Sequence, residues 1–552
     1  MSHALTSATT LEHLRKEAKR WLRALRAGDP RARQRLLAAT PTAPAEPGLR
    51  DVQLALAREY ALPGWASLRQ VMGELALARR SMAERAAIVL RSAWDGGDRA
   101  AARRILGRWP ELGAHDLYTA VVTGNRSEIE RRLAADPAAA TRKGGPLDWE
   151  PLLYLAYARL PGGDDDAVAI ARLFLDHGAD PNTRFNDNWE NPFTALTGVI
   201  GEGEGDRLPH PQAQALATLL IERGADPVDT QAFYNTSITR DDVAWLDFLW
   251  THSERLGRTG LWKSMGKKLG GKVLLPPVDY LLGNAVAYDH RLRAEWLLRH
   301  GADANGVAAY TQRPLREEAL VYGNVVMADL LEKHGARVAP LSQHAAFQVA
   351  CMRLDRETAR ALATEHPAYL LAADPMLTAA RLRDAEVVAL LLELGTPVDV
   401  ADSTGLRGLH NAASSGALDV ARLLIAHGAD IDRPTTHYGG AMGFASHFGQ
   451  QAMLDLLAPL SRDVNNLVYT GMTERLGQLF AEDPALVNAV HFRLGNTPLF
   501  ALPNDEDEAA GMAAFLLAHG ADPGIRNKEG LTPEEAARRR GLIDAADLMS
   551  VR

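Results

Sequence analysis

The 552-residue sequence is poor in cysteine and in aromatic side chains, and it lacks long apolar runs. Its single cysteine, Cys351, rules out an internal disulfide and points to a reducing compartment, so we expect a cytoplasmic protein. One cysteine also excludes the zinc sites that need several thiolates. No stretch approaches the roughly 20 apolar residues of a membrane span, and charges from Glu12 onward argue against a secretory signal peptide.

The sequence has no overall positive charge. Its 61 basic and 69 acidic residues give a net charge of -8, which does not favour general binding to nucleic acid or to an anionic membrane. Residues 1–40 are the exception, with nine basic side chains against three acidic ones. These are Arg15, Lys16, Lys19, Arg20, Arg23, Arg26, Arg31, Arg33 and Arg35. They form either the solvated face of a helix pair or a surface that recruits an acidic partner, nucleic acid being a further alternative.

Motifs that would indicate catalysis are missing. The sequence contains no H-E-x-x-H, no paired C-x-x-C and no G-x-S-x-G. Residues 266–272 match the G-x-x-x-x-G-K spacing of a phosphate-binding loop, but Val273 lacks the metal-binding hydroxyl, and we expect Pro276 and Pro277 to prevent the helix that must follow. We therefore predict no catalytic residue, no metal, no cofactor and no bound nucleotide.

A short string built on Gly-Ala, followed by Asp in five of six copies, recurs along the chain. Copies begin at His177, Arg223, His300, His334, His427 and His519. Each follows a leucine-rich amphipathic run, and a glycine at that point ends a helix by adopting a left-handed conformation. Two spacings set the period, because Gly301 to Gly335 is 34 residues and Gly395 to Gly428 is 33 residues.

A second pattern accompanies the first and gives the repeat its identity. Residues 407–413 read Arg-Gly-Leu-His-Asn-Ala-Ala, and weaker copies of the same turn and helix start near residues 150, 191, 313, 497 and 532. With a 33-residue period, this resembles the ankyrin repeat, whose units are a turn and two helices. The best unit runs from Asp402 to Asp432, with Leu409, Ala412 and Ala413 predicted to face inward. The resemblance implies a structural role for His410.

Another set of helices is predicted to stop at an X-Pro pair. Thr40-Pro41, Trp109-Pro110, Asp136-Pro137, His366-Pro367 and Asp483-Pro484 each lie 12 residues after a residue that opens the helix. Proline disfavours the helical conformation of the residue before it, so each helix should end there. These units resemble variant repeats of bacterial ankyrin proteins, and they extend the array over most of the chain.

The predicted fold class is an all-α ankyrin-repeat solenoid, with two parts. Residues 1–80 form an N-terminal helical segment that either caps the solenoid or folds separately. It resembles a segment that opens several bacterial ankyrin proteins, with Glu59, Tyr60 and Trp65 as landmarks. Residues 81–552 form the repeat array, with irregular insertions near 160–166, 199–211 and 250–278.

The ankyrin resemblance implies a non-enzymatic scaffold or adaptor that binds another protein on its concave face and finger loops. The candidate contact residues at the loop tips are Trp149, Arg184, Phe185, Trp189, Tyr310, His437, Tyr438, His491, Phe492 and Arg493. The alternative for the aromatic residues is packing against their own or the next finger. The alternative function is a small-molecule pocket, or an active site, built by the insertions at 199–211 and 258–277.

Overall fold

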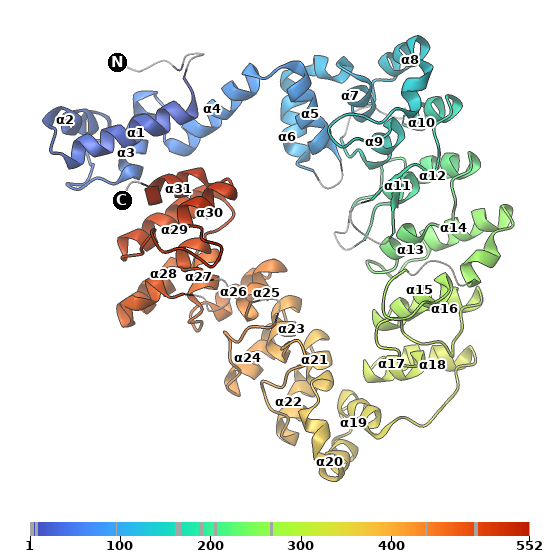
Figure 1. The fold of residues 1–552 in the computed structure, drawn as a ribbon. Coiled ribbons are helices and arrows are strands. Elements are labelled where there is room, and N and C mark those ends of the chain that lie inside the picture. The colour runs from blue at the N-terminus through green and yellow to red at the C-terminus, as the bar shows by residue number, and fades with distance from the viewer. Residues whose placement is uncertain are drawn as a thin grey trace. The chain divides into compact units, whose positions relative to one another are not determined.

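The computed structural model describes residues 5, 9–94, 97–160, 167–186, 191–203, 207–264, 269–436, 439–490 and 495–550. It divides the chain into two compact units. The middle unit holds residues 79–345, and the terminal unit holds residues 1–78 together with 346–552. Both are built from paired helices (Figure 1).

The middle unit opens with the pair α5 (Met82–Ala93) and α6 (Arg99–Arg108). The first helices of the later pairs are α7 (Leu117–Val122), α9 (Pro151–Tyr157), α11 (Ala195–Ile200), α13 (Thr230–Thr236), α15 (Pro277–Ala287) and α17 (Leu315–Val321). The second helices are α8 (Arg126–Ala135), α10 (Ala167–Asp176), α12 (Ala213–Glu222), α14 (Ala244–Arg255), α16 (Arg291–Arg299) and α18 (Val325–Lys333). First helices follow one another in one row and second helices in another (Figure 1).

Short elements connect these pairs. They are the 3-10 helices η1 (Pro110–Ala114), η2 (Pro137–Thr141) and η3 (Thr259–Lys263), and the antiparallel strands β1 (Arg184–Phe185) and β2 (Phe193–Thr194). The two strands lie in the segment that connects α10 to α11. Segments that connect successive helix pairs are called finger loops below.

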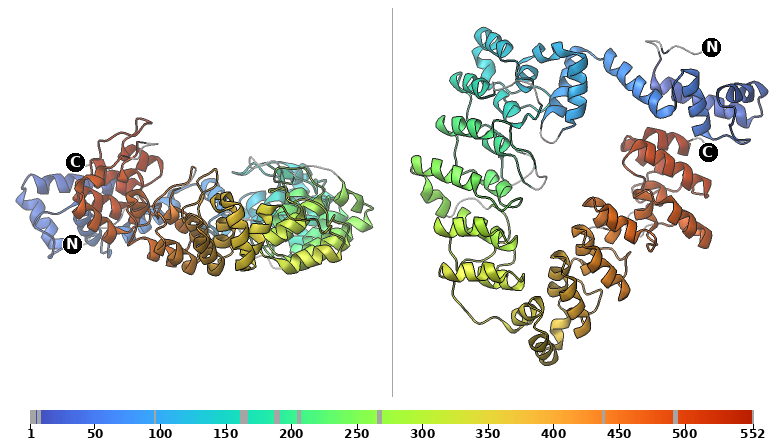
Figure 2. Two further views of the ribbon diagram at one scale, coloured as in Figure 1. Left: turned by 90° about the horizontal axis from the view of Figure 1, so that it is seen from below. Right: turned by 180° about the vertical axis from the view of Figure 1, so that it is seen from behind.

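The terminal unit combines both ends of the chain. Its N-terminal helices are α1 (Leu11–Arg26), α2 (Pro30–Ala39), α3 (Leu49–Glu59) and α4 (Trp65–Arg79). Helix α19 (Gln343–Met352) spans the boundary, and the later helices are α20 (Arg356–Glu365), η4 (Pro367–Leu371), α21 (Asp374–Arg381), α22 (Ala385–Leu394), α23 (Gly408–Ser415), α24 (Leu418–Ala426), α25 (Ala441–His447), α26 (Gln451–Leu457), α27 (Val464–Tyr469), α28 (Thr473–Glu482), η5 (Pro484–Asn488), η6 (Pro498–Phe500), α29 (Glu506–Ala518), α30 (Pro533–Arg539) and α31 (Ile543–Ser550). The N-terminal helices lie beside the last ones in both views of Figure 2.

The helix ends predicted at the Gly-Ala strings are confirmed. The glycine of every copy has a positive φ between 86° and 106°, and the residue before it caps the helix in α12, α16, α18, α24 and α29. In four copies the residue at that position is a histidine that adds a hydrogen bond, namely His177, His300, His427 and His519. His300 and His427, for example, donate from Nδ1 to the carbonyl oxygen four residues earlier, at 2.7 and 2.9 Å. These bonds satisfy carbonyl groups that a helix end leaves without a partner.

The helix ends predicted at X-Pro pairs are confirmed as well. Helices α2, α6, α8, α20 and α28 end at the caps Thr40, Trp109, Asp136, His366 and Asp483, each directly before its proline.

The expectation that Pro276 and Pro277 prevent a following helix is wrong. They do not prevent a helix, because α15 begins at Pro277. Proline fits the first helical position, where its missing N–H has no partner to lose.

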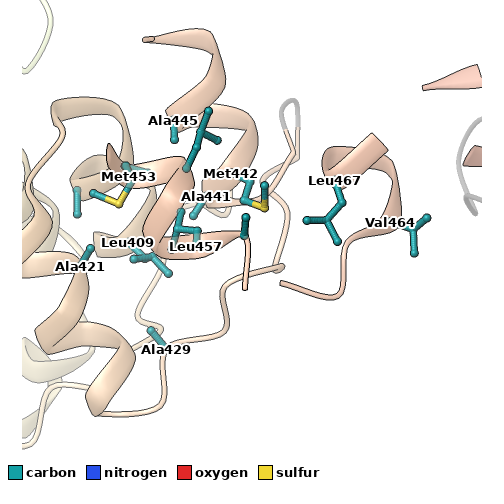
Figure 3. Packing of buried hydrophobic residues seen from close by; sticks show 14 of the residues in the cluster. Leu409, Ala421, Ala429, Ala441, Met442, Ala445, Met453, Leu457, Val464 and Leu467 are labelled. Carbon is teal, nitrogen blue, oxygen red and sulfur yellow. The ribbon is translucent and has the colours of Figure 1, made fainter. Parts of the chain in front are cut away.

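The core of the repeats is a continuous apolar cluster that follows the helix pairs. In the terminal unit, buried side chains from Phe347 to Met549 form one such cluster. Figure 3 shows part of it, where Leu409, Ala441 and Leu457 lie close together. The predicted inward-facing residues Leu409, Ala412 and Ala413 are at most 3% exposed. Small side chains at these positions let neighbouring helices approach closely.

A repeated asparagine bridges successive repeats. Asn305 donates from Nδ2 to the carbonyl oxygen of Gly335 at 3.0 Å, and its Oδ1 accepts from the amide of Arg337 at 2.9 Å. Asn182 and Asn488 make the same pair of bonds to the following repeat. These side chains tie each helix end to the next, which fixes the spacing of the repeats.

Gly428 offers a test of the repeat register. Its φ is +87° and no atom lies within 4 Å of an added Cβ, so Gly428→Ala strains only the backbone and should destabilise the terminal unit by about 1 kcal/mol. Gly477 is the matched control. It lies inside α28 with equal space around it, so Gly477→Ala should stabilise by about 0.5–1 kcal/mol. Chemical denaturation measures both, and shifts of the same sign would contradict the assigned helix end.

Candidate binding site between two finger loops

The first finger loop of the site, residues 142–150, is held by hydrogen bonds. The amide of Gly144 donates to the carbonyl oxygen of Trp149 at 3.1 Å. The hydroxyl of Tyr154, in α9, donates to the carbonyl oxygen of Gly144 at 3.0 Å and accepts from the amide of Leu147 at 3.1 Å. Burial raises the pKa of Tyr154 to about 12, which keeps this hydroxyl protonated at neutral pH. The loop is therefore fixed by the helix behind it.

Aromatic rings join this loop to the next. Trp149 is 7% exposed, and its ring stacks on Phe185 of β1 with centroids 4.4 Å apart. Phe185 stacks in turn on Phe193 of β2 at 5.4 Å. Tyr154 and Tyr157 pack against Trp149 from α9, each at 5.5 Å. Ring contacts of this kind add stability beyond the buried area, so they give the two fingers a rigid aromatic wall.

A pocket lies beside this wall. Its volume is about 350 Å³, and it is lined by Lys143, Leu147, Asp148, Trp149, Arg184, Phe185 and Asn186. Lys143, Asp148, Arg184 and Asn186 are exposed at its rim. Neither the Lys143 ammonium nor the Arg184 guanidinium has a side-chain partner among the residues that the structure describes. Among the described lining residues, the charged side chains are two cations and one carboxylate, a surplus of one positive charge.

The predicted contact residues have different positions. The structure brings Trp149, Arg184 and Phe185 together around one pocket. The ring of Trp149 also stacks on Phe185 of the next finger loop, as expected in the alternative that aromatic residues pack between fingers. Tyr310 lies on another finger, 48% exposed, with its hydroxyl 3.2 Å from that of Tyr280. The remaining candidates, Trp189, His437, Tyr438, His491, Phe492 and Arg493, lie outside the described residues.

Sequence reasoning missed Lys143, Leu147, Asp148 and Asn186. The sequence-based prediction favoured mainly aromatic residues at loop tips. These four residues line the pocket because of the course that the backbone takes in the two finger loops. One local signal was present. Lys143 precedes Gly144 and Gly145, and Gly145 has a φ of +65°, which is typical of a tight turn that presents its neighbours.

The predicted insertions are closely packed where they are described. Arg159 links the segment 199–211 to α11, because it donates to the carbonyl oxygens of Leu208 at 2.9 Å and of Gly198 in α11 at 2.6 Å. In the later insertion, the amide of Lys272 donates to the carbonyl oxygen of Ala309 at 2.7 Å. Residues 161–166, 204–206 and 265–268 lie outside the described residues, and with them part of the sequence that resembles a phosphate-binding loop.

Among the described residues, no group of three or more histidine, cysteine, aspartate or glutamate side chains is placed so that it could hold a metal ion. No helix in the described part of the chain is long and apolar enough to cross a membrane.

The stacked helix pairs and finger loops define an all-α ankyrin-repeat solenoid, as the sequence predicted. Residues 347–435 and 376–468 match the family model described as "Ankyrin repeats (3 copies)". Residues 347–468 therefore contain ankyrin repeats, and ankyrin repeats generally mediate protein–protein interaction.

A curated relative supports this assignment. Over 187 residues the chain is 27% identical to "Putative ankyrin repeat protein YahD" of Escherichia coli (strain K12). The matched region covers 31% of this chain and 92% of that protein.

Proposed function

We propose that this chain is a non-enzymatic cytoplasmic adaptor that binds another protein at the pocket between the finger loop 142–150 and residues 184–186 of the next finger loop. The observation that carries the proposal is a rigid aromatic wall beside two cations, Lys143 and Arg184, that have no side-chain partner among the described residues. Aromatic walls supply contact area at low cost in side-chain entropy. The single cysteine supports the cytoplasmic assignment.

The charges at the rim favour an acidic segment of the partner. A guanidinium binds a carboxylate through two parallel hydrogen bonds, and a lysine adds a flexible positive charge. Because Lys143 and Arg184 form no ion pair within the described chain, a partner carboxylate gains their attraction without breaking an existing contact. Asp148 at the same rim disfavours a second acidic side chain close to it.

The proposal is tested by site-specific photo-cross-linking. A photoreactive amino acid at Asn186, on the pocket rim, should capture a specific partner protein from native lysate. The matched control is Arg172, an exposed residue of the second helix α10, where the same amino acid should not capture that partner.

Charge reversal then ties the capture to the pocket. With the purified partner, Lys143→Glu combined with Arg184→Glu should weaken binding at least tenfold, equivalent to about 1.4 kcal/mol, whereas Arg172→Glu should not. Equal cross-linking from both positions, or unchanged affinity after the double reversal, would exclude this pocket as the binding site.

A further inference from the structure

Two surfaces of opposite charge meet inside the terminal unit. The basic surface belongs to α1 and α4, and the acidic surface to α29 and α31. The ion pairs are Arg15–Asp544 at 2.8 Å, Arg15–Glu506 at 3.3 Å, Lys19–Asp547 at 3.1 Å, Arg69–Asp507 at 2.5 Å, Arg69–Glu506 at 3.4 Å and Arg69–Asp544 at 3.5 Å. The residues that pair are about 440–530 positions apart in the sequence, as the sequence numbers show. The two ends of the chain therefore form a common interface.

The central carboxylates of this interface are shielded from water. The side chains of Asp544 and Asp547 are 4% and 6% exposed. Besides its ion pairs, Asp544 accepts a hydrogen bond from Nε1 of Trp65 at 3.0 Å. Its own amide donates to Glu506 at 2.7 Å, which holds the acidic groups of α29 and α31 together. Charge pairs in such a setting are screened less by salt than exposed pairs are.

Apolar contact across the interface is small. Buried side chains of α1–α4, such as Leu14, Leu22 and Leu56, form a cluster of their own. The repeats from Phe347 onward form a separate cluster. Leu548 of α31 packs against both. The contacts that join α1–α4 to α29 and α31 are therefore mainly ion pairs and hydrogen bonds, and the two sides do not share one hydrophobic core.

We propose that α1–α4 is a detachable cap for the last repeat, held on the acidic face of α31 by this ion-pair network. In a repeat array each repeat covers a face of its neighbour, and α1 and α4 cover the acidic face of α31 in the same way. Here the cap comes from the opposite end of the same chain.

The last repeat depends on the cap for charge compensation. Asp544 and Asp547 are three residues apart on α31 and lie on one helix face, where like charges destabilise the helix. Arg538 of the same repeat pairs with Asp547 at 2.8 Å. The ion pairs of Asp544 come from the cap, through Arg15 and Arg69. Releasing the cap leaves this carboxylate without those charges, so the release weakens α31.

The cap also accounts for part of the positive surplus in residues 1–40. Arg15 and Lys19 face the last repeat, Arg35 pairs with Glu17 and Glu59, and Arg33 donates to the carbonyl oxygen of Pro44. The acidic partner of Arg15 and Lys19 is this chain itself.

Hydrogen exchange on the full-length protein tests the cap. Arg15→Glu combined with Arg69→Glu should speed amide exchange in residues 543–550 at least tenfold, while exchange in residues 387–391 of α22 stays unchanged. Lys16→Glu is the matched control, because Lys16 lies on the same helix, is 69% exposed and pairs with Glu12. It should change neither segment.

A charge swap distinguishes loss of the ion pair from misfolding of the variants. Arg15→Glu and Asp544→Arg should each speed exchange in residues 543–550, and the combined variant should exchange more slowly than either. On the unaltered protein, raising NaCl from 50 mM to 1 M should speed exchange in 543–550 relative to 387–391.

Three results would overturn the proposal. Unchanged exchange in residues 543–550 after Arg15→Glu with Arg69→Glu would show that the cap does not hold this helix. No recovery in the charge swap would show that the pairing of Arg15 with Asp544 is not formed. Protection that rises with protein concentration, together with a dimer by light scattering, would show that a second copy supplies the cap.

Discussion

Replacing Trp262 by alanine is expected to lower the free energy of unfolding of the middle unit by about 3–5 kcal/mol. Trp262 lies in η3, within the irregular segment 250–278, and its side chain is fully buried. Its ring packs against Phe233 at 4.4 Å and Trp250 at 5.3 Å, and its Nε1 donates to Oγ of Ser253 at 2.9 Å. Alanine leaves a cavity among these groups and removes the donor to Ser253.

Chemical denaturation followed by hydrogen exchange measures this loss and locates it. Trp262→Phe keeps most of the ring volume and should cost clearly less than alanine. Trp245 in α14 is the control, because it is only half-buried and Trp245→Ala should destabilise less than Trp262→Ala does. Equal losses from the two alanine variants would contradict the central position assigned to Trp262.

The burial of Trp262 could not be predicted from the sequence, whereas the helix ends could. The helix ends at the Gly-Ala strings and at the X-Pro pairs were predicted because proline and a left-handed glycine act on their own neighbours. The position of Trp262 depends on Phe233, Trp250 and Trp296, which come from three different helices. No periodic pattern in its own segment marks it as buried.

The same distinction applies to the candidate site and the cap. Trp149 and Phe185 were selected as aromatic loop residues, but their mutual stacking depends on the spacing of two finger loops. The pairing of Arg15 with Asp544 joins residues 529 positions apart. The sequence shows a basic N-terminal segment, and only the fold shows which carboxylates it meets.

His210 is expected to make the stability of the middle unit depend on pH. It lies in the insertion 199–211 and is 8% exposed. Burial, followed by the positive charge of Arg159, lowers the pKa of His210 to about 4. Its Nδ1 accepts a hydrogen bond from the amide of Gln212 at 3.1 Å, which requires this nitrogen to be unprotonated. The folded state therefore contains the neutral imidazole.

The direction of the effect follows from proton binding. Between the unfolded pKa near 6.5 and the folded pKa of about 4, the unfolded chain binds more protons than the folded one. Stability from this group is fully present above pH 6.5 and is lost as the pH falls toward 4, by up to about 3 kcal/mol. This loss should favour release of the 199–211 segment, which Arg159 holds through the carbonyl oxygen of Leu208.

The measurement compares the protein with His210→Gln, which cannot titrate in this range but can still accept a hydrogen bond. Free energies of unfolding at pH 7 and pH 4 contain contributions from many groups, so the difference between the two proteins isolates that of His210. The variant should lose less stability than the unaltered protein over this interval, by up to about 3 kcal/mol. Equal losses of stability in the two proteins would contradict a buried, neutral imidazole at His210. They would place the 199–211 segment in a more open arrangement.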